Sequence, residues 1–195
     1  MKIPGRRDLK RFTIRHLCLL LSLLFFKIAT ADSLWPEDAQ RLNVGINILP
    51  ACLVADLALS KKLTPSGKLR ILVLHKDNYA SALSVSEGLS ALKRIGGYPM
   101  EIEIISTSER QEPHDKPVAA LFIASPGINS EIFNNWVRYR QTTVFSPFLG
   151  DVERGAIAGL YVTDRILPYI NTSQAKLAGV IYKPFFLRIA KQYNE

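Results

Sequence analysis

The sequence predicts an α/β fold: a single three-layer domain in which a mixed, mostly parallel sheet is flanked by helices. Two apolar runs, the near-continuous 69–74 and the uninterrupted 118–124, have the composition of strands that are buried on both faces of a sheet. Segments with apolar residues at helical spacing alternate with these runs, as in sheets that carry helices on both faces. The alternation ends after residue 150, where we expect an antiparallel hairpin at one edge of the sheet.

The first half of the chain is expected to supply two helices around the first strand. A first helix runs from Asp38 to Leu63 and is either kinked at Pro50 or begins its second half there. A turn at 64–67 separates it from the strand 69–74. The second helix covers 78–95 and stops at Gly96-Gly97. The apolar positions that predict the first helix are Leu42, Ile46, Leu49, Leu53, Leu57 and Leu63.

The second half is expected to complete the sheet and to end in helices. A loop at 107–117 connects the second strand to the apolar run 118–124, and a strand–helix junction follows at Ser125-Pro126-Gly127. The remaining predicted elements are a strand at 100–106, a helix through Arg140, a strand at 143–145, the hairpin strands 156–162 and 165–170 joined at Thr163-Asp164, a helix from Thr172 to Gly179, and a helical restart at Pro184.

The first 31 residues have the three parts of a cleavable export signal. A basic start precedes an apolar run at 17–26, and a small-x-small site follows at Ala29-Thr30-Ala31. The apolar run is shorter than the ~20 residues that a membrane-spanning helix needs. We therefore expect residues 1–31 to be a signal peptide, residues 32–195 to form the domain, and the protein to be periplasmic. An uncleaved anchor is the alternative.

The composition without that segment argues against nucleic-acid binding. Of the 25 basic and 17 acidic residues, 18 and 16 remain once the segment's seven Lys/Arg and single Asp are left out, so the net charge is about +2. A balanced surface of this kind lacks the basic footprint of a nucleic-acid-binding protein. Cys52 is then the one cysteine, which excludes an internal disulfide; it is either a buried side chain or a site of intermolecular pairing.

The chain offers few groups for catalysis, and we predict no enzyme activity, no metal and no cofactor. No dinucleotide, Walker or nucleophile-elbow motif is present. His114, between two carboxylates, suggests either a metal ligand or a solvated loop, and we favour the loop. His75 follows the first strand, at the end where such folds bind ligands, and Ser125 opens a strand-to-helix turn that suits an anion. Ser125 and His75 are therefore the candidate ligand-binding residues, and an edge residue and a helix cap are the alternatives.

The loop at 145–151 and the hairpin that follows it are the candidate contacts for a protein partner. Exposed Phe side chains in this loop would suit a protein contact or a ligand pocket, whereas buried ones would cover the sheet edge. We expect Phe148 and Asp151 in the loop, with Tyr161 and Arg165 in the hairpin, to form the partner-binding surface.

The final third of the chain resembles the exported YfiR/HmsC-like regulators (DUF4154-like). That family has a Gly-x-Ile strand, an Asn that closes the hairpin, an Ala-Gly-Leu break and a Leu-Leu-Arg-Leu-Ala terminal helix at the same spacing. The matching residues here are Gly155-Ala156-Ile157, Arg165-Ile166, Ile170-Asn171, Ala175, Ala178-Gly179-Val180 and Phe186-Leu187-Arg188-Ile189-Ala190.

The resemblance implies a periplasmic, non-enzymatic repressor that binds the periplasmic part of an inner-membrane diguanylate cyclase and so lowers cyclic-di-GMP signalling and biofilm formation. An outer-membrane lipoprotein partner and a homodimer are further expectations for this protein. The chain departs from the family in its lone Cys52, where known members carry paired cysteines, and in Ile48-Leu49-Pro50 within the first helix.

A second hypothesis is a periplasmic small-ligand-binding protein of an ABC-type transport system. The repeated strand–helix units fit such receptors, but these usually have two domains with a cleft between them, and residues 32–195 supply one. Stabilisation by a metabolite would favour this hypothesis, and an activity lost on substitution of His75 or His114 would favour an enzyme.

Overall fold

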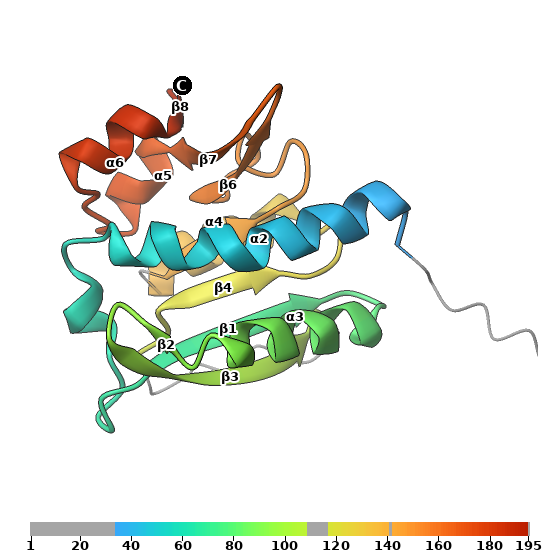
Figure 1. Ribbon diagram of the computed structural model, residues 1–195, viewed down its shortest axis with the longest axis horizontal. Coiled ribbons are helices and arrows are strands. Elements are labelled where there is room, and N and C mark those ends of the chain that lie inside the picture. The colour runs from blue at the N-terminus through green and yellow to red at the C-terminus, as the bar shows by residue number, and fades with distance from the viewer. Residues whose placement is uncertain (1–33, 109–116, 141, 195) are drawn as a thin grey trace, which may run out of the picture. The chain divides into compact units, whose positions relative to one another are not determined.

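A computed structural model describes residues 34–108, 117–140 and 142–194 (Figure 1). The expected signal peptide and His114 lie outside these described residues. Residues 34–195 form one compact unit, and no helix within the described part of the chain combines the length and the apolar character needed to cross a membrane.

The described strands form one eight-stranded sheet in the order β2-β3-β1-β4-β5-β6-β7-β8. The pairs β2–β3 and β6–β7 are antiparallel, and the other neighbouring pairs are parallel. The predicted α/β fold with a mostly parallel sheet and a C-terminal antiparallel hairpin is therefore confirmed. The strands are β1 (Leu69–His75), β2 (Arg94–Ile95), β3 (Tyr98–Ser106), β4 (Ala120–Ile123), β5 (Thr143–Ser146), β6 (Ala158–Val162), β7 (Ile166–Asn171) and β8 (Lys191–Tyr193).

The helices cover both faces of this sheet. The connection from β1 to β3 and the connection from β4 to β5 run in opposite directions across the sheet. Because such crossovers are right-handed, the helix in the first connection and the helix in the second lie on opposite faces. The first of these helices packs beside the N-terminal helix, in front of the sheet in Figure 1. The helices are α2 (Pro36–Val54), α3 (Tyr79–Ala91), α4 (Ser130–Arg140), α5 (Thr172–Leu177) and α6 (Pro184–Ile189), with a short 3-10 helix, η1 (Leu59–Lys62).

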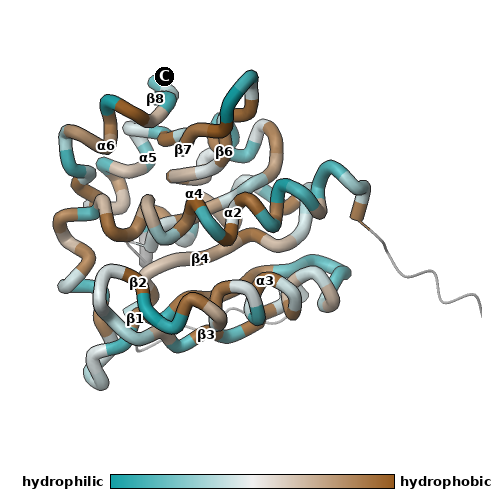
Figure 2. The backbone as a smooth tube through the Cα atoms, viewed as in Figure 1, coloured by the Kyte–Doolittle hydropathy of each residue, from teal (hydrophilic) through white to brown (hydrophobic). Residues whose placement is uncertain are grey.

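Helix α2 buries one stripe against the sheet. Its buried apolar residues Leu42, Ile46, Leu49 and Leu53 follow helical spacing, and Figure 2 shows the resulting alternation of apolar and polar segments. Pro50 lies inside the helix, which continues past it to Val54. The stripe holds the helix against the strands that form the core.

The prediction that this helix reaches Leu63 is wrong, because Asp56 diverts the chain. The Asp56 Oδ1 atom accepts hydrogen bonds from the backbone N–H of Ala58 at 2.9 Å and of Ile181 at 3.3 Å. The first of these bonds forms a turn in place of the next helical turn. Leu57 consequently points to solvent although its spacing matches the buried stripe.

Asp56 also forms a buried ion pair with Lys62. The Lys62 Nζ atom lies 3.0 Å from Asp56 Oδ2 and 3.2 Å from the hydroxyl of Thr143, the first residue of β5. The Asp56 side chain is 1% exposed and that of Lys62 is 11% exposed. One carboxylate therefore connects the end of α2, η1, β5 and the segment before α6.

The sequence also did not predict the hairpin β2–β3. Gly96-Gly97 was expected to stop a helix, but α3 ends at Ala91 and the two glycines form the turn of this hairpin. Both have positive φ angles, 59° and 87°, as a two-residue turn of this handedness requires. A second addition is β8, which pairs outside the C-terminal hairpin.

Replacing Asp56 should test how much the fold depends on its ion pair. Asp56→Asn keeps an acceptor oxygen for the two N–H groups but leaves the Lys62 ammonium buried without its counter-charge. We expect the free energy of unfolding, measured by urea titration, to fall by about 3–5 kcal/mol. The double variant Asp56→Asn/Lys62→Met should recover much of this loss. A loss within about 0.5 kcal/mol for Asp56→Asn, typical of surface changes, would contradict the argument.

The Cys52 thiol should be unreactive in the folded protein. Cys52 is fully buried, and its burial raises the pKa of the thiol to about 12. Because the thiolate is the reactive form, we expect no reaction with Ellman's reagent near pH 8 until denaturant is added. Rapid labelling at Cys52 of the native protein, or a dimer linked through Cys52 on a non-reducing gel, would contradict this prediction.

Candidate functional site

The loop after β5, predicted to contact a partner, is packed into the domain. Phe145 is fully buried, Phe148 is 5% exposed and Asp151 is 0% exposed. The expectation that Phe148 and Asp151 present their side chains to a partner is therefore wrong for this structure. The aromatic rings cover the sheet, which is the alternative that the sequence left open.

Asp151 explains why this loop is buried. Its Oδ2 atom accepts a hydrogen bond from the Ser146 hydroxyl at 2.5 Å, and its Oδ1 atom pairs with the guanidinium of Arg154. The backbone N–H of Ala156 donates to the carbonyl of Asp151 at 2.9 Å. Burial raises the pKa of Asp151, and the bonds from Ser146 and Arg154 oppose this only in part. The carboxylate thus closes the loop from inside.

The β6–β7 hairpin, in contrast, presents the other two predicted contact residues. Arg165 is exposed at the turn of the hairpin, and Tyr161 is partly exposed on β6. Val162 and Ile166, which face each other in the ladder, are also exposed. The predicted turn at Thr163-Asp164 is confirmed, with the Thr163 hydroxyl donating to Asp164 Oδ1 at 2.9 Å.

Tyr161 belongs to an aromatic group that crosses three strands. Its ring centroid lies 5.5 Å from that of Tyr169 on β7, which lies 6.4 Å from that of Tyr193 on β8. The Lys191 ammonium lies 5.4 Å from the centre of the Tyr161 ring, within the range of a cation–π contact. Burial and the Glu153 carboxylate that its hydroxyl contacts raise the pKa of Tyr169 to about 12. We call Tyr161, Tyr169, Tyr193 and Lys191 the tyrosine cluster.

The sequence did not predict most of this cluster. Tyr169 on β7 lies opposite Gly159 on β6, and Tyr161 is two residues after Gly159. Because every second residue of a strand points to the same side, Tyr161 and Tyr169 share one face of the sheet. Tyr193 and Lys191 join them only through β8, a three-residue strand whose sequence carries no strand pattern. Side chains alternate between the two faces of a strand, and this alternation along the predicted hairpin was the one signal that could have indicated the Tyr161–Tyr169 pair.

The two predicted ligand-binding residues lie together at the carboxyl ends of β1 and β4. The backbone N–H of Lys76, next to His75, donates to the Ser125 hydroxyl at 3.2 Å. The His75 ring packs edge-on against Tyr79, with centroids 5.7 Å apart, and its Nδ1 has no hydrogen-bond partner among the described residues. This is the point where the strand order reverses, which is where open α/β sheets usually bind ligands.

Ser125 does not open a helix, however, so the predicted anion site at a helix N-terminus is wrong. Helix α4 begins five residues later, at Ser130, and the Asn129 side chain accepts the N–H of Glu131 at 3.0 Å. Ser125 is a buried turn residue whose hydroxyl holds the end of β1. The Ser-Pro-Gly sequence favoured a cap, but Asn129 performs that function.

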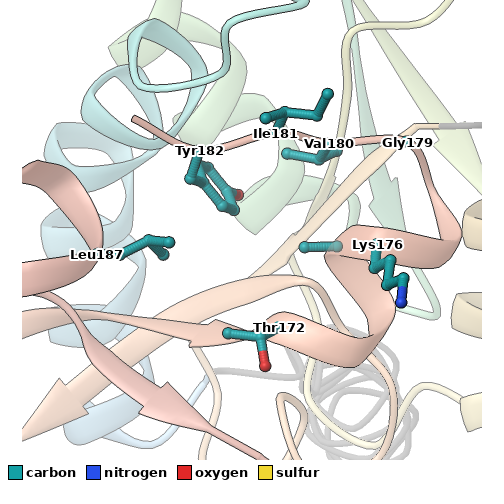
Figure 3. Close-up of a pocket in the computed structure, with 8 residues that line it drawn as sticks. Thr172, Lys176, Gly179, Val180, Ile181, Tyr182 and Leu187 are labelled. Atoms are coloured by element: carbon teal, nitrogen blue, oxygen red, sulfur yellow. The ribbon is translucent and has the colours of Figure 1, made fainter. Parts of the chain in front are cut away.

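A pocket of about 400 Å³ lies at the opposite end of the sheet, between α5 and α6 (Figure 3). Its walls are mainly apolar, and Lys176 and Thr172 contribute the polar groups. Tyr182 packs its ring against Phe186 at 5.3 Å, and burial raises the pKa of its hydroxyl, which has no hydrogen-bond partner among the described residues. The lining residues are Thr172, Ala175, Lys176, Gly179, Val180, Ile181, Tyr182 and Leu187.

The described residues contain no group of three or more His, Cys, Asp or Glu side chains that could hold a metal ion. Surfaces that could bind a partner or ligand include the hairpin with the tyrosine cluster, the turn at His75 and Ser125, and the pocket between α5 and α6.

Comparison with known proteins adds little. No family model matches the sequence, and no curated protein matches it. A solved structure with a similar arrangement is an ABC domain in complex with L-Trp from Streptococcus pneumonia, at 16% sequence identity and a TM-score of 0.48. The match covers 72% of this chain and 61% of that one.

The buried Asp151 should make stability depend on pH. The pKa of Asp151 is raised in the folded protein, so folding favours the protonated form of this side chain. Its contribution to stability is therefore fully present below the ordinary pKa of 3.8 and is lost as pH rises through the pKa of the folded state. Asp151→Asn cannot titrate and should lack this component. We expect the native protein to lose stability relative to Asp151→Asn as pH rises from about 4, as measured by urea unfolding at a series of pH values. A constant difference between the two proteins over that range would contradict the raised pKa.

Proposed function

We propose that this protein is an exported, non-enzymatic regulator that binds the periplasmic part of an inner-membrane diguanylate cyclase and represses cyclic-di-GMP signalling. The proposed family and export both come from the sequence: the YfiR/HmsC-like motifs between 155 and 190, and the signal-like segment 1–31. The observation that carries the protein-binding part of this proposal is the exposed hairpin, which presents Arg165 and one member of the tyrosine cluster, Tyr161. Tyr and Arg are the residue types that most often dominate binding energy at protein interfaces.

The motif residues behind the resemblance have mainly structural positions. Ile157, Asn171, Ala178 and Phe186 are buried, and Asn171 both caps α5 and donates to the Val152 carbonyl at 2.9 Å. The resemblance therefore concerns the framework of β6, β7, α5 and α6, which supports the hairpin. Partner choice would depend on the exposed residues that this framework presents.

A small-ligand-binding protein is the second candidate, and the pocket between α5 and α6 favours it. Its volume of about 400 Å³ lies within the range of small-molecule sites, and its walls are mostly apolar with a few polar groups. None of its lining residues is among the predicted ligand residues, Ser125 and His75. A metabolite at about 100 times its dissociation constant would add about 2.7 kcal/mol to the free energy of unfolding.

Affinity capture from cross-linked cell envelopes tests the regulator proposal. The tagged protein, expressed from the full chain, should recover a membrane diguanylate cyclase that mass spectrometry identifies. Tyr161→Ala/Arg165→Ala should weaken this binding about 30-fold, since truncating an interface hot spot costs about 2 kcal/mol or more.

The matched control is Tyr79→Ala/Arg138→Ala, which removes an exposed Tyr and an exposed Arg from α3 and α4. It should bind the cyclase as the native protein does. Recovery of a transport permease in place of a cyclase would favour the ligand-binding candidate. Equal losses in both double variants would show that the hairpin is not the contact surface.

A further inference from the structure

Four large apolar side chains face solvent at the end of the domain that carries α6. Leu57, Ile181, Phe185 and Ile189 are each more than half exposed. The backbone N–H of Leu57 donates to the carbonyl of Ile181 at 2.8 Å, so these two residues are neighbours. Phe185 and Ile189 lie one turn apart on the same side of α6. We call these four residues the α6 surface.

The charged side chains of the described segment that carries α6, residues 172–194, are all basic. The described residues 172–194 include no Asp or Glu, and their Lys and Arg side chains are all at least partly exposed. The Asp56 carboxylate, next to this segment, is buried and paired with Lys62, so it does not offset the positive charge at the surface. The basic residues are Lys176, Lys183, Arg188 and Lys191.

Lys183 also shows how this end is built. Its backbone N–H donates to the carbonyl of Ala55 at 2.9 Å, and its Nζ atom donates to the carbonyl of Val54 at 2.8 Å. These bonds hold the start of α6 against the end of α2. The apolar side chains of the α6 surface therefore extend from a fixed base, so little backbone freedom would be lost when they become buried.

We propose that the α6 surface docks on a bilayer of anionic phospholipid. The exposed Phe, Ile and Leu side chains would enter the headgroup region, and Lys176 and Arg188 would face lipid phosphates. Protein interfaces are depleted in Lys, whereas an apolar surface with only basic charges is typical of segments that lie in the membrane interface. The pocket beside Ile181 and Leu187 offers apolar walls and the Lys176 ammonium to an inserted lipid. This inference goes beyond the proposed function and does not depend on it.

Vesicle sedimentation tests the proposal without any partner protein. The protein is expressed from the full chain and recovered as the cell processes it. It is then mixed with vesicles of phosphatidylcholine, with or without phosphatidylglycerol, which gives the vesicle a negative surface. We expect binding to the phosphatidylglycerol vesicles that weakens as salt is raised. Phe185→Ser/Ile189→Ser should lower the partition coefficient about tenfold. Arg188→Gln should lower it about fivefold on the anionic vesicles alone.

The control variant is Val162→Ser/Ile166→Ser, which removes two exposed apolar residues from the hairpin. It should bind vesicles as the native protein does, and thermal melting should show that all variants are folded. Three results would overturn the proposal: no binding of the native protein to anionic vesicles, equal binding to both lipid mixtures, or equal losses in the hairpin and α6 variants. The last result would indicate non-specific adsorption.

Discussion

The carboxylate of Asp56 is the single interaction on which the arrangement of this domain depends most. It ends α2, binds the N–H of Ile181 and pairs with Lys62, which in turn reaches Thr143 at the start of β5. Residues 125 positions apart in the chain are thereby joined at a buried point. A buried charge is tolerated only when it is paired and hydrogen-bonded, so these segments have little freedom to separate. Together with the Lys183 bonds to Ala55 and Val54, this constraint fixes the start of α6.

A second buried carboxylate decides which surface remains available for binding. Asp151 closes the loop after β5 from within, and Gly159 allows that closure because a Cβ atom there would lie 2.5 Å from the Ser146 carbonyl oxygen. The loop therefore packs against β6, and the hairpin extends beyond it. Aromatic residues in the loop form core, whereas those on the hairpin and β8 form a partly exposed cluster.

The direction of the strands separates the two proposed binding surfaces. Because β6 runs parallel to β5, the hairpin turn lies at the carboxyl ends of the central strands. β7 runs in the opposite direction, so α5 and α6, which follow it, lie at the amino ends of the central strands. A protein partner on the hairpin and a lipid surface on α6 would therefore not compete for the same residues. Such an arrangement suits a protein whose proposed partner is anchored in a membrane.

Local patterns in the sequence determined the fold class and the central strands. Apolar runs such as 118–124 are informative by themselves, since a strand buried on both faces needs apolar residues at nearly every position. The contact residues were not predictable in the same way. Phe148 and Tyr161 are both aromatic residues near strand ends, yet one is buried and the other partly exposed. Only the tertiary structure decides between them, because the loop that holds Phe148 is enclosed by residues farther along the chain: β6 pairs with β5, and the Asn171 amide donates to the Val152 carbonyl, 19 residues away.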